Sequence, residues 1–230
     1  MIKIENVETN GWEAAIRGMR NPMNSWEQSD SDLCSATTAC DKHTDSCDCG
    51  GHCVGKADFK LMKSLANAGP DHGKFLRFIT VSLDITAPLY WWKEFDTYKV
   101  GTVANSCSTM HKIHAKEFTL EDFSCEHLDE WATCCLEQTV GVLNHYQQKF
   151  LEAKTKPMKE EAKRAAVMKS YWWQLIQLLP TSYNQRRTVL LNYQVLKSMY
   201  HARKHHKLDE WRTFCEFIKT LPYSELFTDG

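Results

Sequence analysis

The sequence predicts an α+β fold in which a central mixed or antiparallel sheet is joined to a largely helical C-terminal half. Two segments, residues 2–7 and 78–85, alternate apolar and polar side chains or concentrate β-branched and aromatic residues, as strands do. From residue 129 onward, apolar residues recur at helical spacing almost to the end of the chain. Strands in the first half followed by helices in the second are typical of an α+β protein.

The chain has 230 residues, which is long enough for a substantial core, and we expect residues 1–230 to form a single domain. Its net charge of -1 gives no general attraction for a nucleic acid polymer. No stretch approaches the ~20 apolar residues that cross a membrane, and the N-terminus carries charged residues where a signal peptide needs an apolar run. We therefore expect a cytoplasmic protein that binds neither nucleic acid polymers nor membranes.

The first half is expected to contain three helices that begin and end at residues with strong local preferences. They are predicted over residues 11–20, over residues 57–68 and from residue 88 onward. Asn10 can cap the first helix, because its side chain can accept a hydrogen bond from the backbone of the first turn. Pro88 ends the strand before it and suits the first turn of the third helix.

The second half is predicted to be helical throughout. Apolar residues recur every three or four positions over residues 129–155, 158–179, 186–202 and 208–220. Residues 118–125 form a short acidic connector before the first of these helices.

A cysteine-rich insert is expected at about residues 25–55, because this segment has almost no large apolar side chain after Trp26. Its possible metal ligands are Cys34, Cys40, Cys47, Cys49, Cys53, His43 and His52. Thiolate and imidazole bind zinc, but the paired C-x2-C of a structural zinc site is absent, so we favour a reduced, mobile loop without metal. The other five cysteines lie in apolar or helical contexts, where we expect small hydrophobic side chains. They are Cys107, Cys125, Cys134, Cys135 and Cys215.

The segment over residues 88–111 combines aromatic residues with a run of small, hydroxyl and amide side chains. The polar members of the run are Thr102, Asn105, Ser106, Ser108 and Thr109. Such a run packs poorly into a core, but it offers many donors and acceptors and lets a ligand approach the backbone. We interpret it as a ligand-binding segment, with a polar turn as the alternative. Cys107 lies inside it without an identifiable cationic partner, which favours a small buried thiol over a nucleophile.

The residues after Ala87-Pro88 resemble the signature RHRxxSxNxxSxR of the flavin-dependent thymidylate synthases, the ThyX family, in which a strand and a proline lead into that motif. We call the corresponding residues, 97–110, the signature segment. The residues that match the motif in kind are Lys99, Thr102, Asn105 and Ser108. A second match lies downstream, where Leu179-Pro180 is followed by Asn192 after twelve residues and by Arg203 after a further eleven.

The resemblance implies an FAD-binding α+β subunit that assembles into a homotetramer, with each active site built from several chains. It also implies that FAD, reduced by NADPH, mediates transfer of a one-carbon unit from methylenetetrahydrofolate to C5 of dUMP. We therefore expect FAD as the cofactor and a flavin-dependent methyltransferase activity. No side-chain nucleophile is required, because the protein contributes positioning and electrostatics.

The resemblance assigns expected roles to individual residues, because the FAD pyrophosphate needs cations and the flavin ring can accept amide contacts. The residues expected to bind the cofactor are His72, Lys74, Arg77, Lys99, Thr102, Asn105, Asn192, Gln194 and Ser198. Those expected to contact the substrate are Glu94, Ser106, Ser108 and Arg203. Arg203 is the expected catalytic residue, since its charge can stabilise the charge that develops as C5 becomes nucleophilic. The alternative for Arg203 is a cation that complements the helix macrodipole.

Some positions depart from the family pattern, because a neutral residue stands where the resemblance implies a cationic one. They are Thr97, Tyr98, Met110 and Ile176. A phosphate without these partners would lose charge-assisted hydrogen bonds of roughly 1.5–3 kcal/mol each. Residues that could replace them are Lys93, His111, Lys112, Arg186 and Arg187.

Two alternatives therefore stand beside dUMP methylation. The first is a divergent enzyme that acts on another pyrimidine nucleotide, for example by hydroxymethyl transfer. The second is a flavin- or nucleotide-binding protein without turnover, whose cysteine loop senses redox state or metal.

Overall fold

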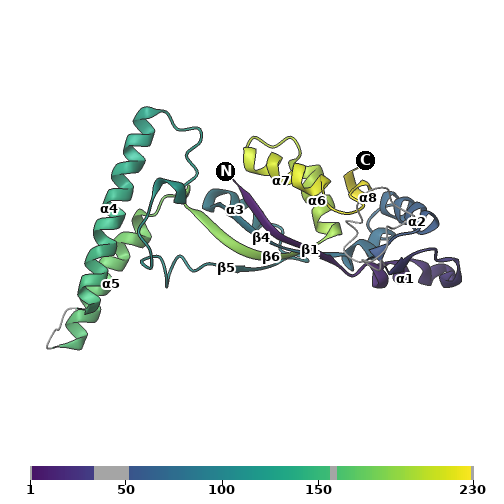
Figure 1. The fold of residues 1–230 in the computed structure, drawn as a ribbon, viewed down its shortest axis with the longest axis horizontal. Helices are drawn as coiled ribbons and strands as arrows, with labels where there is room; N and C mark the ends of the chain where they lie inside the picture. The colour runs from purple at the N-terminus through teal and green to yellow at the C-terminus, as the bar shows by residue number, and fades with distance from the viewer. Residues whose placement is uncertain (1, 34–51, 156–159, 229–230) are drawn as a thin grey trace. The chain divides into compact units, whose positions relative to one another are not determined.

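The computed structural model describes residues 2–33, 52–155 and 160–228 of the chain. Its helices and strands confirm the prediction of an α+β fold (Figure 1). Contacts divide the chain into two compact units. Unit 1 contains the described residues of 86–94 and 106–187, and unit 2 contains those of 2–85, 95–105 and 188–230.

The main sheet has four strands in the order β1-β4-β6-β5. They are β1 (Lys3–Asn10), β4 (Thr80–Pro88), β6 (Asn184–Asn192) and β5 (Val103–Ser106). β4 and β6 are antiparallel, because the backbone N–H of Tyr193 donates to Ile79 while that of Leu89 donates to Tyr183. A separate two-stranded antiparallel sheet pairs β2 (Asp32–Leu33) with β3 (His52–Cys53).

β4 forms where the sequence predicts a strand, because its side chains alternate between a buried and a half-exposed face. Val81, Leu83 and Ile85 are buried on one face, and Asp84 lies on the other. There the Asp84 carboxylate accepts hydrogen bonds from the Asn6 amide on β1, at 2.8 Å, and from the Thr188 hydroxyl on β6. These polar contacts join three neighbouring strands on the face away from the buried side chains.

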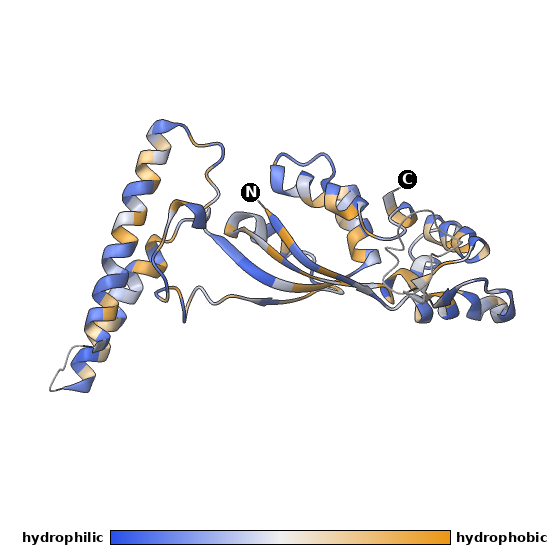
Figure 2. Cartoon of the chain, viewed as in Figure 1, coloured by the Kyte–Doolittle hydropathy of each residue, from blue (hydrophilic) through white to orange (hydrophobic). Residues whose placement is uncertain are grey.

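β6 shows that the predicted helix over residues 186–202 is wrong in its first part, and that the second half is not wholly helical. Gln185, Val189 and Leu191 are buried and are separated by exposed or half-exposed residues, which is a strand pattern. Figure 2 shows the strand changing from hydrophilic at its start to more hydrophobic near its end. The backbone N–H and C=O groups of β6 form hydrogen bonds with β4, whereas in a helix they would have bonded to residues nearby in the sequence.

The other predicted helices lie close to their expected positions, and the short helix α8 after them was not predicted. Their bounds are α1 (Trp12–Arg20), α2 (Lys56–Asn67), α3 (Leu89–Phe95), α4 (Glu130–Thr155), α5 (Glu161–Leu178), α6 (Tyr193–Arg203), α7 (Asp209–Lys219) and α8 (Glu225–Thr228). Short 3-10 helices are η1 (Asn21–Met23), η2 (Trp26–Gln28), η3 (Gly73–Arg77) and η4 (Leu120–Asp122). Asn10 does not cap α1 as predicted, because it ends β1 and Gly11 takes the cap position. Among the helices described, none combines the length and apolar character needed to cross a membrane.

Unit 1 is built around a hairpin in which α4 and α5 pack against each other (Figure 1). On α4, Leu136, Val140 and Leu143 are buried at helical spacing and form one apolar stripe. Leu175 on α5 and Phe118, from the connector that precedes α4, belong to the same core. The hairpin thus forms where the sequence predicts two long helices.

Unit 2 has an aromatic core that fixes the beginning of α6. The ring of Tyr193, the first residue of α6, makes an edge contact with Trp12 of α1, with 5.3 Å between the centroids, and with Phe227 of α8 at 5.0 Å. Burial raises the pKa of the Tyr193 hydroxyl above its ordinary value, and the hydroxyl donates to the carbonyl of Pro222 at 2.6 Å. The position of α6 is therefore set by packing on both sides of Tyr193.

The first residues of the cysteine-rich insert are anchored to α2 by a buried ion pair. The Asp58 carboxylate accepts from Nε of Arg20 and from the hydroxyls of Ser29 and Ser31, each at 2.6 Å. Arg20 also donates to the carbonyls of Ser25 and Gln28. These bonds satisfy both buried charges, as a buried pair requires. The four insert cysteines from Cys34 to Cys49, and His43, lie outside the described residues.

Candidate functional site

The signature segment begins with a turn and continues as the strand β5, which lies at one edge of the sheet. The Thr102 hydroxyl donates to the backbone carbonyl of Tyr98 and closes the turn. Gly101 has a φ of 78°, a left-handed conformation that favours glycine. Lys99 in the turn and Asn105 on β5 are exposed.

The start of α6 packs directly on this turn. A Cβ atom added to Gly101 would lie 2.5 Å from Nδ2 of Asn192, so only glycine leaves room for the Asn192 amide. The Oδ1 atom of Asn192 accepts from the backbone N–H of Val195 at 3.0 Å and caps α6. Asn192 therefore holds its position through the helix cap while its amide nitrogen faces the signature segment.

The end of α6 meets the same turn through Arg203. Its Nε donates to the Tyr98 hydroxyl at 3.0 Å, and its guanidinium carbon lies 4.8 Å from the centroid of a Trp211 ring. Arg203 is half-buried, and Trp211 is fully buried. A cation held against an aromatic face and a hydroxyl has a fixed orientation. Sequence reasoning missed Tyr98 and Trp211 as partners, because no local pattern links residues so far apart.

A further group of predicted residues gathers where η3 lies against α6. A Cβ atom on Gly73 would lie 3.7 Å from Oε1 of Gln194, so the two elements are in contact there. His72, Lys74 and Arg77 are exposed at or beside η3. Ser198, one turn after Gln194, donates to the Gln194 carbonyl at 3.1 Å. All nine residues expected to bind the cofactor belong to unit 2.

The residues expected to contact the substrate are divided between the units, and Glu94, Ser106 and Ser108 belong to unit 1. Glu94 is half-buried on α3, and Ser106 is exposed on β5. The Ser108 hydroxyl accepts from the backbone N–H groups of Met110, at 3.3 Å, and His111, at 2.8 Å. Arg203, the fourth residue expected to contact the substrate, belongs to unit 2.

The prediction that the Cys107 thiol is buried is wrong, and two cysteines expected to act as small hydrophobic side chains are also exposed. Cys107 is exposed, and so are Cys134 and Cys135 on α4. Cys107 follows β5, the edge strand of the main sheet, and the two α4 cysteines lie beside the apolar stripe rather than on it. Cys215 is buried as expected, and burial raises the pKa of its thiol to about 11.

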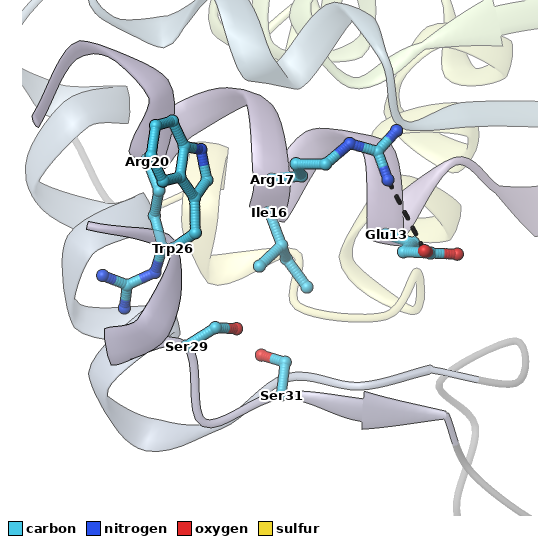
Figure 3. A pocket seen from close by; sticks show the side chains of 7 residues that line it. All are labelled: Glu13, Ile16, Arg17, Arg20, Trp26, Ser29 and Ser31. Atoms are coloured by element: carbon cyan, nitrogen blue, oxygen red, sulfur yellow. Dashed lines mark hydrogen bonds and ion pairs between the residues drawn. The ribbon is translucent and has the colours of Figure 1, made fainter. Parts of the chain in front are cut away.

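Two cavities lie away from the predicted site residues. One of about 190 Å³ is lined by the side chains drawn in Figure 3, which are Glu13, Ile16, Arg17, Arg20, Trp26, Ser29 and Ser31. The other, of about 520 Å³, lies between residues 7–10 of β1 and residues 217–222. Neither contains a residue expected to bind a ligand. Within the described part of the chain, no three His, Cys, Asp or Glu side chains are grouped so that they could hold a metal.

The fold matches solved structures along the whole chain. Thymidylate Synthase X (ThyX) from Helicobacter pylori with FAD and dUMP gives a TM-score of 0.66 at 14% identity, covering 100% of this chain and 98% of that one. A second structure of the Helicobacter pylori enzyme with FAD and dUMP gives 0.63 at 15% identity, covering 99% and 98%. The UMP/dUMP methylase PolB from Streptomyces cacaoi, bound with 5-Br dUMP, gives 0.57 at 11% identity, covering 100% and 95%. No protein-family model and no curated protein matches the sequence.

These similarities define the class of fold. The chain is an α+β protein whose four-stranded sheet and helical elements follow those of the matched structures. More narrowly, it has the ThyX fold, which confirms the fold implied by the signature segment and by the spacing of Leu179-Pro180, Asn192 and Arg203.

We predict that Gly101→Ala destabilises the protein by about 1–3 kcal/mol, because alanine is strained at positive φ and its Cβ would displace the Asn192 amide. The matched control is Gly141→Ala on α4, where no atom lies within 4 Å of the added Cβ. There we expect stabilisation of about 0.5–1 kcal/mol, since alanine favours helix over glycine. Urea denaturation measures both free energies of unfolding. Equal effects of the two substitutions would contradict the packing of Asn192 on Gly101.

Proposed function

We propose that the protein is an FAD-dependent enzyme that transfers a one-carbon unit from methylenetetrahydrofolate to C5 of a pyrimidine nucleotide, with dUMP as the first candidate and NADPH as the reductant. One observation carries this proposal. Both ends of α6 meet the turn of the signature segment, with Asn192 against Gly101 and Arg203 against Tyr98. The spacing that resembles the ThyX family thus corresponds to physical contacts in this chain.

The residues of unit 2 fit a flavin dinucleotide. His72, Lys74 and Arg77 are exposed cationic or titratable groups on one short element, which suits a pyrophosphate. The amide groups of Asn192 and Gln194 lie nearby on α6 and suit hydrogen bonding to a flavin edge or ribityl chain. We propose that these residues hold FAD, together with Lys99, Thr102, Asn105 and Ser198. When bound, FAD supplies the redox chemistry of the reaction.

Arg203 has the properties of an electrostatic catalyst in this proposal. Its guanidinium is fixed by the Tyr98 hydroxyl and the Trp211 ring, so little reorientation is needed when charge develops on a nearby pyrimidine. Glu94, Ser106 and Ser108 are proposed to contact the rest of the substrate. The second candidate substrate is UMP, because one of the matched structures is a UMP/dUMP methylase.

We predict that the protein binds FAD, and that Asn192→Ser and Asn192→Ala both weaken this binding by about tenfold, since each removes the amide donor. Serine keeps an oxygen that can cap α6, whereas alanine does not, so only Asn192→Ala should also lower the free energy of unfolding by ~1 kcal/mol. Flavin absorbance and fluorescence titration measure binding, and thermal unfolding measures the cap. A wild-type protein that stays colourless after reconstitution would contradict the proposal of FAD.

We predict release of tritium from C5-labelled dUMP when FAD, NADPH and methylenetetrahydrofolate are present. Arg203→Gln should lower kcat/KM by about 10²–10³, as loss of one well-placed electrostatic donor does. Arg212→Gln is the matched control, because Arg212 is an exposed arginine on α7 that pairs with Asp209. Release from UMP instead of dUMP selects the second candidate. An FAD-bound protein that releases tritium from neither nucleotide, and turns over no other pyrimidine nucleotide, is a binding protein without turnover.

We also propose a homotetramer. The α4–α5 hairpin leaves large apolar side chains exposed, including Trp131, Val142 and Trp173, and such groups are commonly covered in assemblies. Light scattering of the purified protein should give a mass of four chains of 26.7 kDa each. A mass of one chain at micromolar concentration would refute this arrangement.

A further inference from the structure

The larger of the two cavities, of about 520 Å³, lies within unit 2 between the strand β1 and the segment that follows α7. One wall is made by residues 7–10 of β1, and the other by Phe217 and residues 220–222. Side chains alternate between the two faces of a strand, so four consecutive residues can line a cavity only when it runs along the edge of the strand. The cavity therefore borders the backbone of β1 as well as its side chains.

The backbone groups at this edge are those of the first strand in the sheet. β1 begins the order β1-β4-β6-β5, and no other described strand pairs with its outer edge. Alternate backbone N–H and C=O groups of an edge strand point away from the sheet, at the spacing that a further strand would need. An extended peptide is the ligand that matches such an edge, because its own backbone supplies the complementary donors and acceptors.

The wall opposite β1 suits the apolar side chains of such a peptide. Leu221 is buried there, and Phe217 and Pro222 are half-buried. The Thr220 hydroxyl donates to the Phe217 carbonyl at 2.8 Å, so its proton is already used within the chain. A side chain that entered from an added strand would pack against these apolar groups, and the removal of its surface from water would favour binding.

Thr9 adds one polar group to the strand side of the cavity. The residue is only 7% exposed, and its hydroxyl has no hydrogen-bond partner in the part of the chain that the structure describes. A buried hydroxyl without a partner is unfavourable, because its hydrogen bonds to water are lost. A threonine opposite Thr9 in an added strand would supply the missing partner, since threonine hydroxyls pair across neighbouring strands.

Glu8 determines the charge that the peptide should carry. It is exposed and forms no ion pair among the described residues. Because successive side chains lie on opposite faces, a residue opposite Glu8 is on the other face from one opposite Thr9. A lysine there would form a cross-strand ion pair with Glu8. A second copy of β1 fits less well, because its single cation, Lys3, is already paired with Glu5.

We propose that the outer edge of β1 is a docking site for an extended segment of a partner protein, which adds a fifth strand to the main sheet. The segment alternates lysine with threonine or small apolar residues. Its lysines lie on the face of Glu8, and its threonine and apolar side chains lie on the face of Thr9 and enter the cavity. The docking site is independent of the proposed enzyme activity, since none of the residues expected to contact cofactor or substrate lines the cavity.

The test uses the full-length protein and the peptide acetyl-KVKTKVK-amide. The control peptide, acetyl-KKVTVKK-amide, has the same composition and charge, but its alternation is broken. Calorimetry should show that the alternating peptide binds at least about tenfold more tightly, because only this peptide matches both faces of the edge at once. Hydrogen exchange followed by NMR should show slower exchange of the backbone N–H groups of residues 7–10 when the alternating peptide is bound.

Two substitutions test the two faces separately. Thr9→Val keeps the shape of the side chain and removes the hydroxyl, so it should weaken binding of the alternating peptide by about two- to tenfold. Glu8→Lys should weaken it by about fivefold or more, and should make acetyl-EVETEVE-amide the preferred ligand. Glu27→Lys is the matched control, because Glu27 is an exposed glutamate of unit 2 outside the cavity, and should leave both affinities unchanged.

Several results would overturn the inference. Equal affinity for the two lysine peptides would show that charge alone holds them. Binding without protection of residues 7–10, or unchanged affinity in both Thr9→Val and Glu8→Lys, would place the peptide elsewhere on the protein.

The same variants distinguish a partner protein from a second copy of the chain. Self-association that is lost in Glu8→Lys, with no binding of the alternating peptide to the wild type, would assign the edge to a second copy and refute the proposed partner. Light scattering of the wild type and of Glu8→Lys, at the same concentration, measures this difference.

Discussion

The antiparallel pairing of β4 with β6 is the constraint on which the candidate site depends. The bond from Tyr193 to Ile79 fixes the last part of β6 and decides where α6 begins. From that point, one helix of eleven residues carries Asn192 at its cap and Arg203 at its end. Both residues reach the signature segment because the strand has already set the position and direction of the helix. A shift of the β6 register by one residue would turn every β6 side chain to the other face.

Both the correct prediction of β4 and the wrong prediction of β6 follow from the local spacing of apolar residues, which is the only signal that the sequence offers for either segment. β4 contains alternating apolar residues between polar ones, and its pattern fits a strand and no helix. Across residues 186–202, Val189, Leu190 and Tyr193 continue into apolar positions of α6 at helical spacing, so a local pattern predicts one long helix. The strand forms because its backbone groups pair with β4, which lies far away in sequence. Tertiary pairing overrides local propensity there.

The site could be predicted as a set of segments but not as a set of contacts. The resemblance identified the signature segment, Asn192 and Arg203, and the structure places Asn192 and Arg203 against the turn of that segment in unit 2. The partners Trp211 and Trp92 carry no sequence signal, because a tryptophan beneath a guanidinium looks like any core tryptophan. The same limit explains Cys107, whose exposure depends on β5 being an edge strand.

The departures from the family pattern are consistent with the contacts that replace them. At position 98 the chain has a tyrosine whose hydroxyl accepts from Nε of Arg203. A second cation at that distance would oppose Arg203 by roughly 1–4 kcal/mol, depending on the local dielectric. The neutral residue therefore suits a chain that keeps its arginine in contact with this turn. At position 110 a charge is absent from the signature segment, while Arg187 lies opposite Ser106 with its orientation fixed. Arg187 is held by Trp92 and Gln185, so a count of cations within the motif does not describe the charges that the folded chain places beside it.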